Sequence, residues 1–224
     1  MKNIATMFAC CLLLSGIALA QMEKPAEHKT VTQVLNTSVK NVEDEFVPAA
    51  DAMSEDKYSY APTSGEFKGV RTFAQQIKHV AAVNYMIGGA ILGEKPPVDT
   101  GGENGPDSAK SKADIMKFLK DSFAYMHKAA GSIDDKNLVA PIKNPFGEGT
   151  ATRLALALGF AGHCSNHYGQ MVEYLRLTAS CHLPAASRPS IFWGLGRFRP
   201  ARFDCSGTTC PPSPQRSCLS FGIP

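Results

Sequence analysis

Two histidines, His163 and His167, stand four positions apart in a segment with the periodicity of a helix. At 100° per residue they project from the same face, where two imidazoles can hold one metal ion. Left unpaired on an apolar face, each imidazole would lose its hydrogen bonds at a cost of about 1–3 kcal/mol. A divalent ion removes that cost, so the spacing indicates a metal site. The H-x-x-x-H pattern alone is weakly specific, because paired histidines at this spacing also occur on helix surfaces.

A third histidine, His79, stands at the edge of the apolar stripe of an earlier helical segment. If the two helices are neighbours in the fold, three imidazoles converge. Three histidines with open coordination positions are typical of catalytic metal sites, because water or substrate completes the coordination. The alternative for His79 is a core histidine bonded to a backbone carbonyl, and the spacing does not choose between the two. His127 lies off the stripe of its own segment and is expected to be solvated.

Four segments with a period near 3.6 residues must position these side chains. They cover approximately residues 29–53, 70–92, 111–130 and 152–178. Pro48 is expected to kink or interrupt the first of them. No segment alternates as a half-buried strand does, so the sequence predicts an all-α fold, a four-helix bundle. The last segment is apolar on two faces, which predicts burial on both, either centrally in the bundle or in a subunit interface.

The 224 residues are 44% hydrophobic and 19% charged, which suits one packed domain, predicted over residues 29–180. Residues 1–20 follow the pattern of a secretory signal peptide, with an early lysine, an apolar stretch and the cleavage site Ala18-Leu19-Ala20. We therefore expect an exported protein, periplasmic or extracellular, with no membrane span after cleavage. Residues 189–224 contain six prolines and three cysteines and are expected to form a disordered or poorly packed tail.

The formal net charge of +3 arises within residues 189–224, where four arginines stand against one aspartate. The rest of the chain is therefore neutral, and it carries no basic footprint for a nucleic acid. No Ser-His-Asp arrangement or phosphate-binding loop competes with the histidines. The five cysteines after the signal segment are odd in number, so at least one is free or paired between chains. Of these, Cys164 is expected to be a small buried residue rather than a metal ligand.

The segments around the three histidines resemble those of one family. The run QIKHVA at residues 76–81 is similar to the first-histidine segment of the DinB-like superfamily, and HCSNHYGQ at residues 163–170 resembles the motif of its last helix. The resemblance extends roughly from Thr30 to Arg188. It implies a four-helix bundle in which His79, His163 and His167 hold a divalent ion of zinc, nickel, iron or manganese. It also implies a homodimer.

The resemblance further implies a kind of chemistry, because characterised members include thiol-dependent S-transferases and a maleylpyruvate isomerase. In such enzymes a metal lowers the pKa of a thiol and makes it a nucleophile. The leading hypothesis is therefore a metal-dependent enzyme that carries out thiol transfer or hydrolysis on an unidentified small molecule. The alternatives are a non-catalytic metal- or small-molecule-binding bundle, and a structural bundle with a vestigial site.

One departure from the family bears on the site. Between the two histidines the family favours Pro-x-Asp, where this chain has Cys164-Ser165-Asn166. The missing carboxylate could have supported an imidazole from behind. On the same face Gln170 is a candidate for that supporting role, and Tyr174 is expected to pack. No catalytic residue is predicted.

Overall fold

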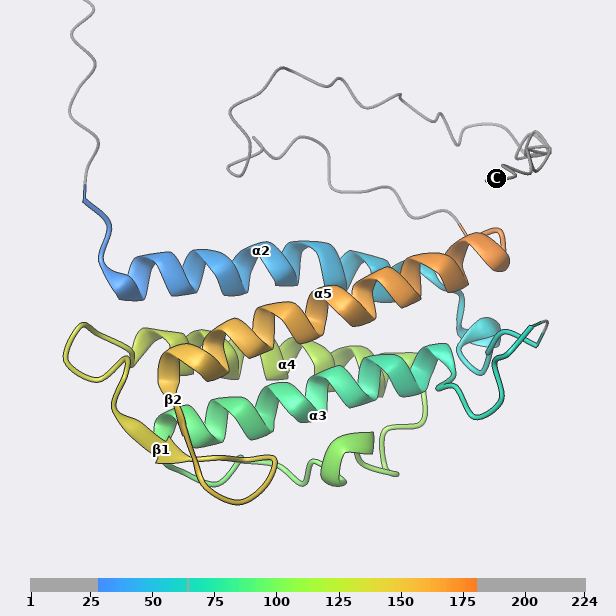
Figure 1. The fold of residues 1–224 in the computed structure, drawn as a ribbon. Coiled ribbons are helices and arrows are strands. Elements are labelled where there is room, and N and C mark those ends of the chain that lie inside the picture. Colours follow the sequence, from blue (N-terminus) through green and yellow to red (C-terminus); the bar gives the residue numbers. More distant parts are fainter. Residues whose placement is uncertain (1–27, 64, 181–224) are drawn as a thin grey trace, which may run out of the picture. The chain divides into compact units, whose positions relative to one another are not determined.

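The computed structural model describes residues 28–63 and 65–180, and the helices and strands among them lie in the unit Val31–Pro224. In chain order they are α2 (Val31–Ala52), η2 (Glu55–Lys57), α3 (Phe73–Leu92), η3 (Gly102–Asn104), α4 (Lys112–Gly131), β1 (Pro141–Lys143), β2 (Thr150–Thr152) and α5 (Arg153–Leu177). The four α-helices lie side by side as a bundle in which α3 packs on α4 and α5, and α2 packs on the same two helices (Figure 1). The predicted four-helix bundle is confirmed.

The helix starts follow from capping side chains. The Thr72 hydroxyl accepts a hydrogen bond from the Gln75 backbone N–H, and the Gln75 side-chain oxygen accepts one from the Thr72 backbone N–H. This reciprocal pair caps the start of α3. Ser111 and Asp114 form the same reciprocal pair at α4, as the sequence suggests. At the other end of α3, Gly93 has a φ of 72°, a left-handed conformation that ends the helix.

Pro48 does not interrupt the first helix, because α2 continues through it to Ala52. Proline in a helix interior removes one backbone hydrogen bond and strains the preceding turn. Here the turn around it is held by packing, since Phe46, Ala49 and Ala50 are completely buried. The predicted interruption at this proline is wrong, because packing of the neighbouring side chains offsets the lost hydrogen bond. The alternative, a kink, stays a prediction.

Three phenylalanines join the helices at the centre of the core. Phe123 of α4 packs on Phe46 of α2 and on Phe160 of α5, with ring centroids 6.2 Å and 6.1 Å apart. All three side chains are essentially inaccessible to solvent. Burial of aromatic side chains contributes strongly to folding, so this trio fixes α5, which carries two of the histidines, against the rest of the bundle.

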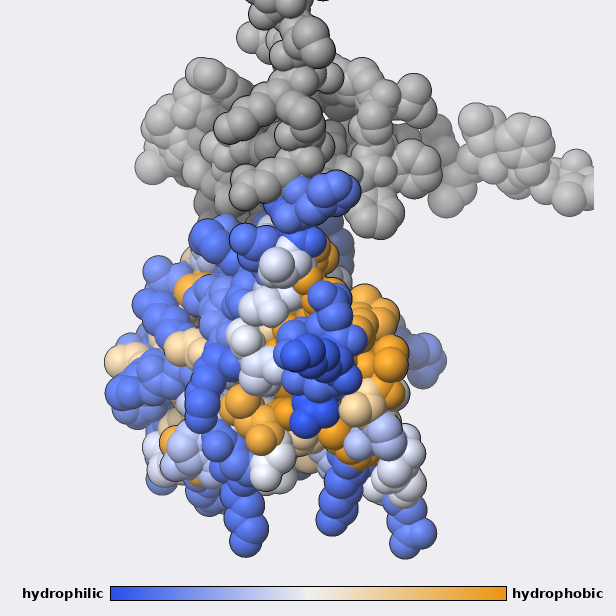
Figure 2. Space-filling view, turned by 90° about the vertical axis from the view of Figure 1, so that its left-hand side faces the viewer, coloured by the Kyte–Doolittle hydropathy of each residue, from blue (hydrophilic) through white to orange (hydrophobic). Residues whose placement is uncertain are grey.

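Helix α5 is not buried on both sides within the chain. One side carries the buried Leu156, Phe160 and Met171, whereas Leu158 on the other side is 63% exposed. Figure 2 shows hydrophobic side chains gathered at the surface on one side of the bundle end where α5 begins. The prediction of a central position for α5 is therefore wrong, and its alternative, a subunit interface, stays a prediction.

A short hairpin that the sequence analysis missed precedes α5. Strands β1 and β2 pair antiparallel, with Ile142 opposite Ala151. Each strand has three residues, too few for an alternating pattern to stand out. The hairpin turn carries Phe146, a residue that lines a pocket described below.

Several expectations concern residues outside the described part of the chain: the signal peptide at 1–20, the tail at 189–224 and the pairing of cysteines beyond Cys164. Among the described helices, none combines the length and the hydrophobicity needed to cross a membrane.

Candidate metal centre

The histidine cluster, which we define as His79, His163 and His167, lies between α3 and α5. One ring nitrogen of each histidine lies within 4.8 Å of the others. The Nε2 atoms of His79 and His163 are 3.1 Å apart, and the three ring centroids are separated by 4.6–5.0 Å. The structure therefore brings together the three side chains that the sequence singles out.

The ring of His79 is oriented by a backbone carbonyl. Its Nδ1 lies 2.5 Å from the carbonyl oxygen of Glu103, in the loop segment η3. A carbonyl oxygen can only accept a hydrogen bond, so Nδ1 carries the proton and Nε2 presents its lone pair to the cluster. A backbone carbonyl bond to His79 was the expected alternative to metal binding. In the fold that bond orients the imidazole as a metal ligand requires.

The ring of His167 is oriented by Gln76, one turn before His79 on α3. His167 Nδ1 lies 2.6 Å from Gln76 Oε1, and the Gln76 amide nitrogen donates to Gln170 Oε1 over 2.8 Å. Gln170 in turn donates to Asn166 Oδ1 over 2.7 Å. The Gln76 oxygen therefore accepts, and His167 Nε2 is free of its proton. Two helices thus share one chain of polarised amides that ends at the surface.

Asn166 stands where the family has its carboxylate, yet it does not touch an imidazole. It is exposed and forms the outer end of the amide chain. Support for His167 comes instead from the opposite helix, through the buried Gln76. The sequence analysis missed Gln76, although its position three residues before His79 places both side chains on one face of α3. The support expected of Gln170 is indirect, through Gln76.

The third ring, His163, has a polar atom with no partner. Its Nδ1 is buried and has no hydrogen-bond partner among the described residues. Its Nε2 faces the Nε2 of His79 at 3.1 Å. Two nitrogens that each lie about 2.0–2.1 Å from a common zinc ion in tetrahedral coordination are roughly 3.3 Å apart, close to the observed separation. The spacing and the donor atoms therefore fit a divalent ion.

Burial keeps the cluster uncharged. Loss of hydration lowers the pKa of His163 to about 4 and that of His167 to about 3, with smaller contributions from the neighbouring histidines and Arg71. Burial also lowers the pKa of His79. At neutral pH the three imidazoles are thus neutral, which is the form that binds metals.

A pocket of about 430 Å³ opens onto the cluster at His79 and His163. Its other walls come mainly from apolar residues of α3, α5 and the hairpin turn. They are Val83, Ile87, Phe146, Leu156 and Gly159, together with Glu103. A small molecule with an apolar part therefore has access to the two histidines.

Cys164 takes no part in the histidine cluster, although it follows His163 directly. Its side chain is completely buried, and its Sγ lies 3.5 Å from Asn84 Oδ1, on the core side of the helix. Burial raises the pKa of this thiol, so it is a poor nucleophile. The prediction of a small buried residue is confirmed.

Other polar candidates are structural. Tyr174 donates to the Arg71 carbonyl, consistent with a packing role, and Tyr58 donates to the Ala50 carbonyl. His127 is not solvated as predicted, because it is half-buried between α4 and α2. Its two ring nitrogens contact Asn36 Oδ1 and Glu43 Oε2. A position off the apolar stripe of α4 becomes an interhelical contact because α2 packs beside it.

Comparison with known proteins places the chain in a family. The sequence model of the DinB superfamily matches residues 39–171, which include the whole histidine cluster.

No curated protein matches the chain. The fold is similar to the crystal structure of a conserved protein from Enterococcus faecalis, at 15% identity and a TM-score of 0.53, over 68% of this chain and 99% of that one. A DinB-like protein from Bacillus subtilis gives 19% identity and a TM-score of 0.49, over 66% of this chain and 95% of that one. The family match covers more than half of the sequence, and this chain belongs to the DinB superfamily.

Proposed function

We propose that this protein is a metal-dependent enzyme in which His79, His163 and His167 hold one divalent cation. The observation that carries the proposal is the convergence of three neutral imidazoles, two of which have their outer nitrogens held by Glu103 and Gln76. A cation held in this way supplies Lewis acidity, which lowers the pKa of a water or thiol that reaches it.

The donor set narrows the choice of metal. Imidazole nitrogen suits zinc, nickel and iron, whereas manganese prefers carboxylate oxygen. No carboxylate of the described residues joins the three histidines in a ligand group. Of the four metals considered from the sequence, zinc, nickel and iron therefore fit the donor set better than manganese.

The residues around the histidines suit a reaction on a small molecule. The apolar pocket would bind the apolar part of the substrate and keep bulk water from the reacting atoms. Thiol transfer and hydrolysis both fit, because each needs a nucleophile of lowered pKa. The chain's own buried thiol, Cys164, lies on the wrong side of α5, so a thiol nucleophile would come with the substrate. Export through the signal-like segment, and a homodimer, belong to the same proposal.

A non-catalytic binding module is the second candidate, and one observation favours it. Apart from the two histidines and Glu103, the apolar pocket is lined by residues that cannot transfer a proton. Glu103 uses its backbone carbonyl to hold His79, and its side chain is exposed. Turnover of substrates by the metal-loaded protein would favour the enzyme, and tight binding without turnover would favour the module.

The first test is the metal content of the purified chain. We expect about one divalent ion per chain by mass spectrometry, and its loss in a His163→Ala/His167→Ala variant. His127→Ala is the matched control, since it removes an imidazole far from the cluster and should leave the metal bound. A chain that holds no ion after incubation with zinc, nickel, iron or manganese would overturn the proposal. The loaded protein is then screened with thiol-transfer and hydrolytic substrates.

A further inference from the structure

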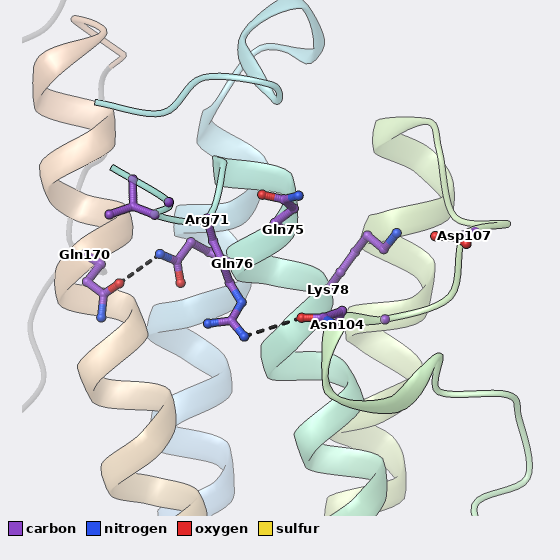
Figure 3. A pocket seen from close by; sticks show the side chains of 10 residues that line it. Arg71, Gln75, Gln76, Lys78, Asn104, Asp107 and Gln170 are labelled. Atoms are coloured by element: carbon purple, nitrogen blue, oxygen red, sulfur yellow. Dashed lines mark hydrogen bonds between the residues drawn. The ribbon is translucent and has the colours of Figure 1, made fainter. Parts of the chain in front are cut away.

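A second pocket, of about 560 Å³, is lined in part by Gln76, the residue that supports His167 (Figure 3). Its lining is polar and includes two half-buried cations, Arg71 and Lys78, along with the amides of Gln76, Asn104 and Gln170. Neither cation forms an ion pair with a carboxylate among the described residues. Two cations against the single carboxylate of Asp107 leave the pocket lining with a net positive charge, which attracts an anion.

Arg71 is held at both ends. Its backbone carbonyl accepts a hydrogen bond from Tyr174 of α5 at 2.9 Å, and its guanidinium Nη2 lies 3.4 Å from Asn104 Oδ1. Figure 3 shows the Arg71 side chain extending across the pocket toward Asn104, with Gln76 and Gln170 beside it. Because the guanidinium has five N–H donors and uses one here, several remain for a ligand.

The loop around η3 forms a wall common to this pocket and the histidine cluster. The carbonyl of Glu103 holds His79, and the next residue, Asn104, holds Arg71. Gly105 has a φ of 79°, and a Cβ there would lie 2.6 Å from the Cβ of Lys78. A side chain at position 105 would collide with Lys78, so glycine lets the loop lie directly against α3.

Gln76 links the two sites on the other side. Its oxygen accepts from His167, and its amide nitrogen points toward Gln170 at the pocket. The charge of Arg71 is also one of the causes that lower the pKa of all three histidines, so the guanidinium lies within electrostatic reach of the cluster.

We propose that this pocket binds a carboxylate of the substrate, with Arg71 as the principal donor. The assignment rests on the proposed function and adds a substrate class, a small organic acid. A guanidinium fork matches a planar carboxylate. The exposed Asp107 lines the pocket near Lys78 and offsets one of the two positive charges, which favours a singly charged group over a phosphate dianion.

The test is a titration of the metal-free full chain, followed by two-dimensional NMR of its backbone amides. The probes are propionate, propionamide as the uncharged analogue, and inorganic phosphate. We expect saturable propionate binding that shifts the amides of Gln76 and Asn104. Propionate should bind at least about tenfold more weakly to Arg71→Gln and a few-fold more weakly to Lys78→Gln, because charge-assisted bonds are lost. Arg71→Lys, which keeps the charge and loses the fork, should be intermediate.

Lys120→Gln is the charge-matched control, since Lys120 is exposed on α4 away from the pocket. It should bind propionate as the natural chain does. Equal propionate binding by Arg71→Gln, absence of saturable binding by the natural chain, or tighter binding of phosphate than of propionate would each overturn the carboxylate assignment. Metal content is measured separately. A natural chain that takes up no metal overturns the proposed function, whereas the titration remains readable because it uses no metal.

Discussion

Two polar clusters lie close together along α3 and α5, and they differ in how their hydrogen bonds are satisfied. The core amide cluster consists of Asn84, Ser122 and Cys164, all completely buried. Asn84 donates to Ser122 Oγ and accepts from Cys164 Sγ, and Ser122 donates to the Leu119 carbonyl. The histidine cluster leaves the Nδ1 of His163 unpaired and turns ring nitrogens toward one another.

The difference separates a structural cluster from the candidate metal site, although His163 and Cys164 are consecutive residues. A satisfied polar network fixes how three helices meet and stabilises the fold. A buried polar atom without a hydrogen-bond partner destabilises the fold, and such atoms are found where a bound ligand or ion offsets the loss. The two clusters should therefore respond in opposite ways to the same kind of substitution.

The largest effect should follow from His163→Leu. We expect metal affinity to fall by more than about 100-fold, since even loss of a supporting residue behind a ligand costs about 10–100-fold. The free energy of unfolding of the metal-free chain should stay the same or rise, because an unpaired buried nitrogen is replaced by carbon. Competition with a chromophoric chelator and urea unfolding measure the two quantities. Retention of full metal affinity would remove His163 from the ligand set.

Asn84→Leu is the counterpart in the core amide cluster. It should lower the free energy of unfolding by about 1–3 kcal/mol, because buried partners on α4 and α5 lose their hydrogen bonds. Metal affinity should not change. The double variant Asn84→Leu/Ser122→Ala should regain part of the loss, since it removes one of the orphaned groups. A fall in metal affinity without a fall in stability would erase the distinction between the clusters.

Gln76→Leu should have a smaller effect on the metal, about a tenfold loss of affinity, because it removes only the partner of His167. Gln76→Glu is the matched variant. Its carboxylate can accept the same hydrogen bond and should restore or exceed the natural affinity. Chelator competition on both variants measures the effect, and equal affinities for Leu and Glu would show that this position does not support the site.

The last comparison concerns the pH dependence of stability. The unfolded chain takes up protons on its histidines near pH 6.5, whereas His163 stays neutral in the fold to about pH 4 and His167 to about pH 3. Stability of the metal-free chain therefore falls as the pH drops from about 6.5 toward these values. Urea unfolding between pH 7 and 4 should show a shallower slope for His163→Leu than for the natural chain. Identical slopes would contradict the lowered pKa of His163.

The helices were largely readable from the sequence, and the reasons are local. Periodicity predicted the last helix over residues 152–178, and α5 runs from Arg153 to Leu177. The effect of Pro48 could not be predicted from the local sequence. Whether the helix continues through it depends on burial against other helices, which here outweighs the missing hydrogen bond. The prediction that α5 is buried centrally in the bundle was also wrong for the described residues. The sequence shows two apolar stripes on this helix, but it does not show which of them packs against a neighbouring helix.

The histidine cluster was also predictable in part, because local spacing along a helix determines which side chains share a face. His163 and His167 were visible from their spacing, and His79 required only that α3 and α5 be neighbours. Their supports were not visible. Gln76 supports His167 from the opposite helix, and Glu103 supports His79 from the connection after α3 through a backbone carbonyl, a group that every residue has. Such partners are set by how loops return to helices, which no spacing rule encodes.

The amide chain that runs from His167 to the surface has a direction. Each carboxamide offers its oxygen on one side and its nitrogen on the other, so Gln76, Gln170 and Asn166 must all point the same way. If His167 gave up its Nδ1 proton, Gln76 would have to turn over, and each amide beyond it would follow. The orientation of the exposed Asn166 amide therefore depends on which ring nitrogen of the buried His167 carries the proton. A change of tautomer beside the candidate metal site would thus alter the hydrogen-bonding groups that the protein presents to solvent.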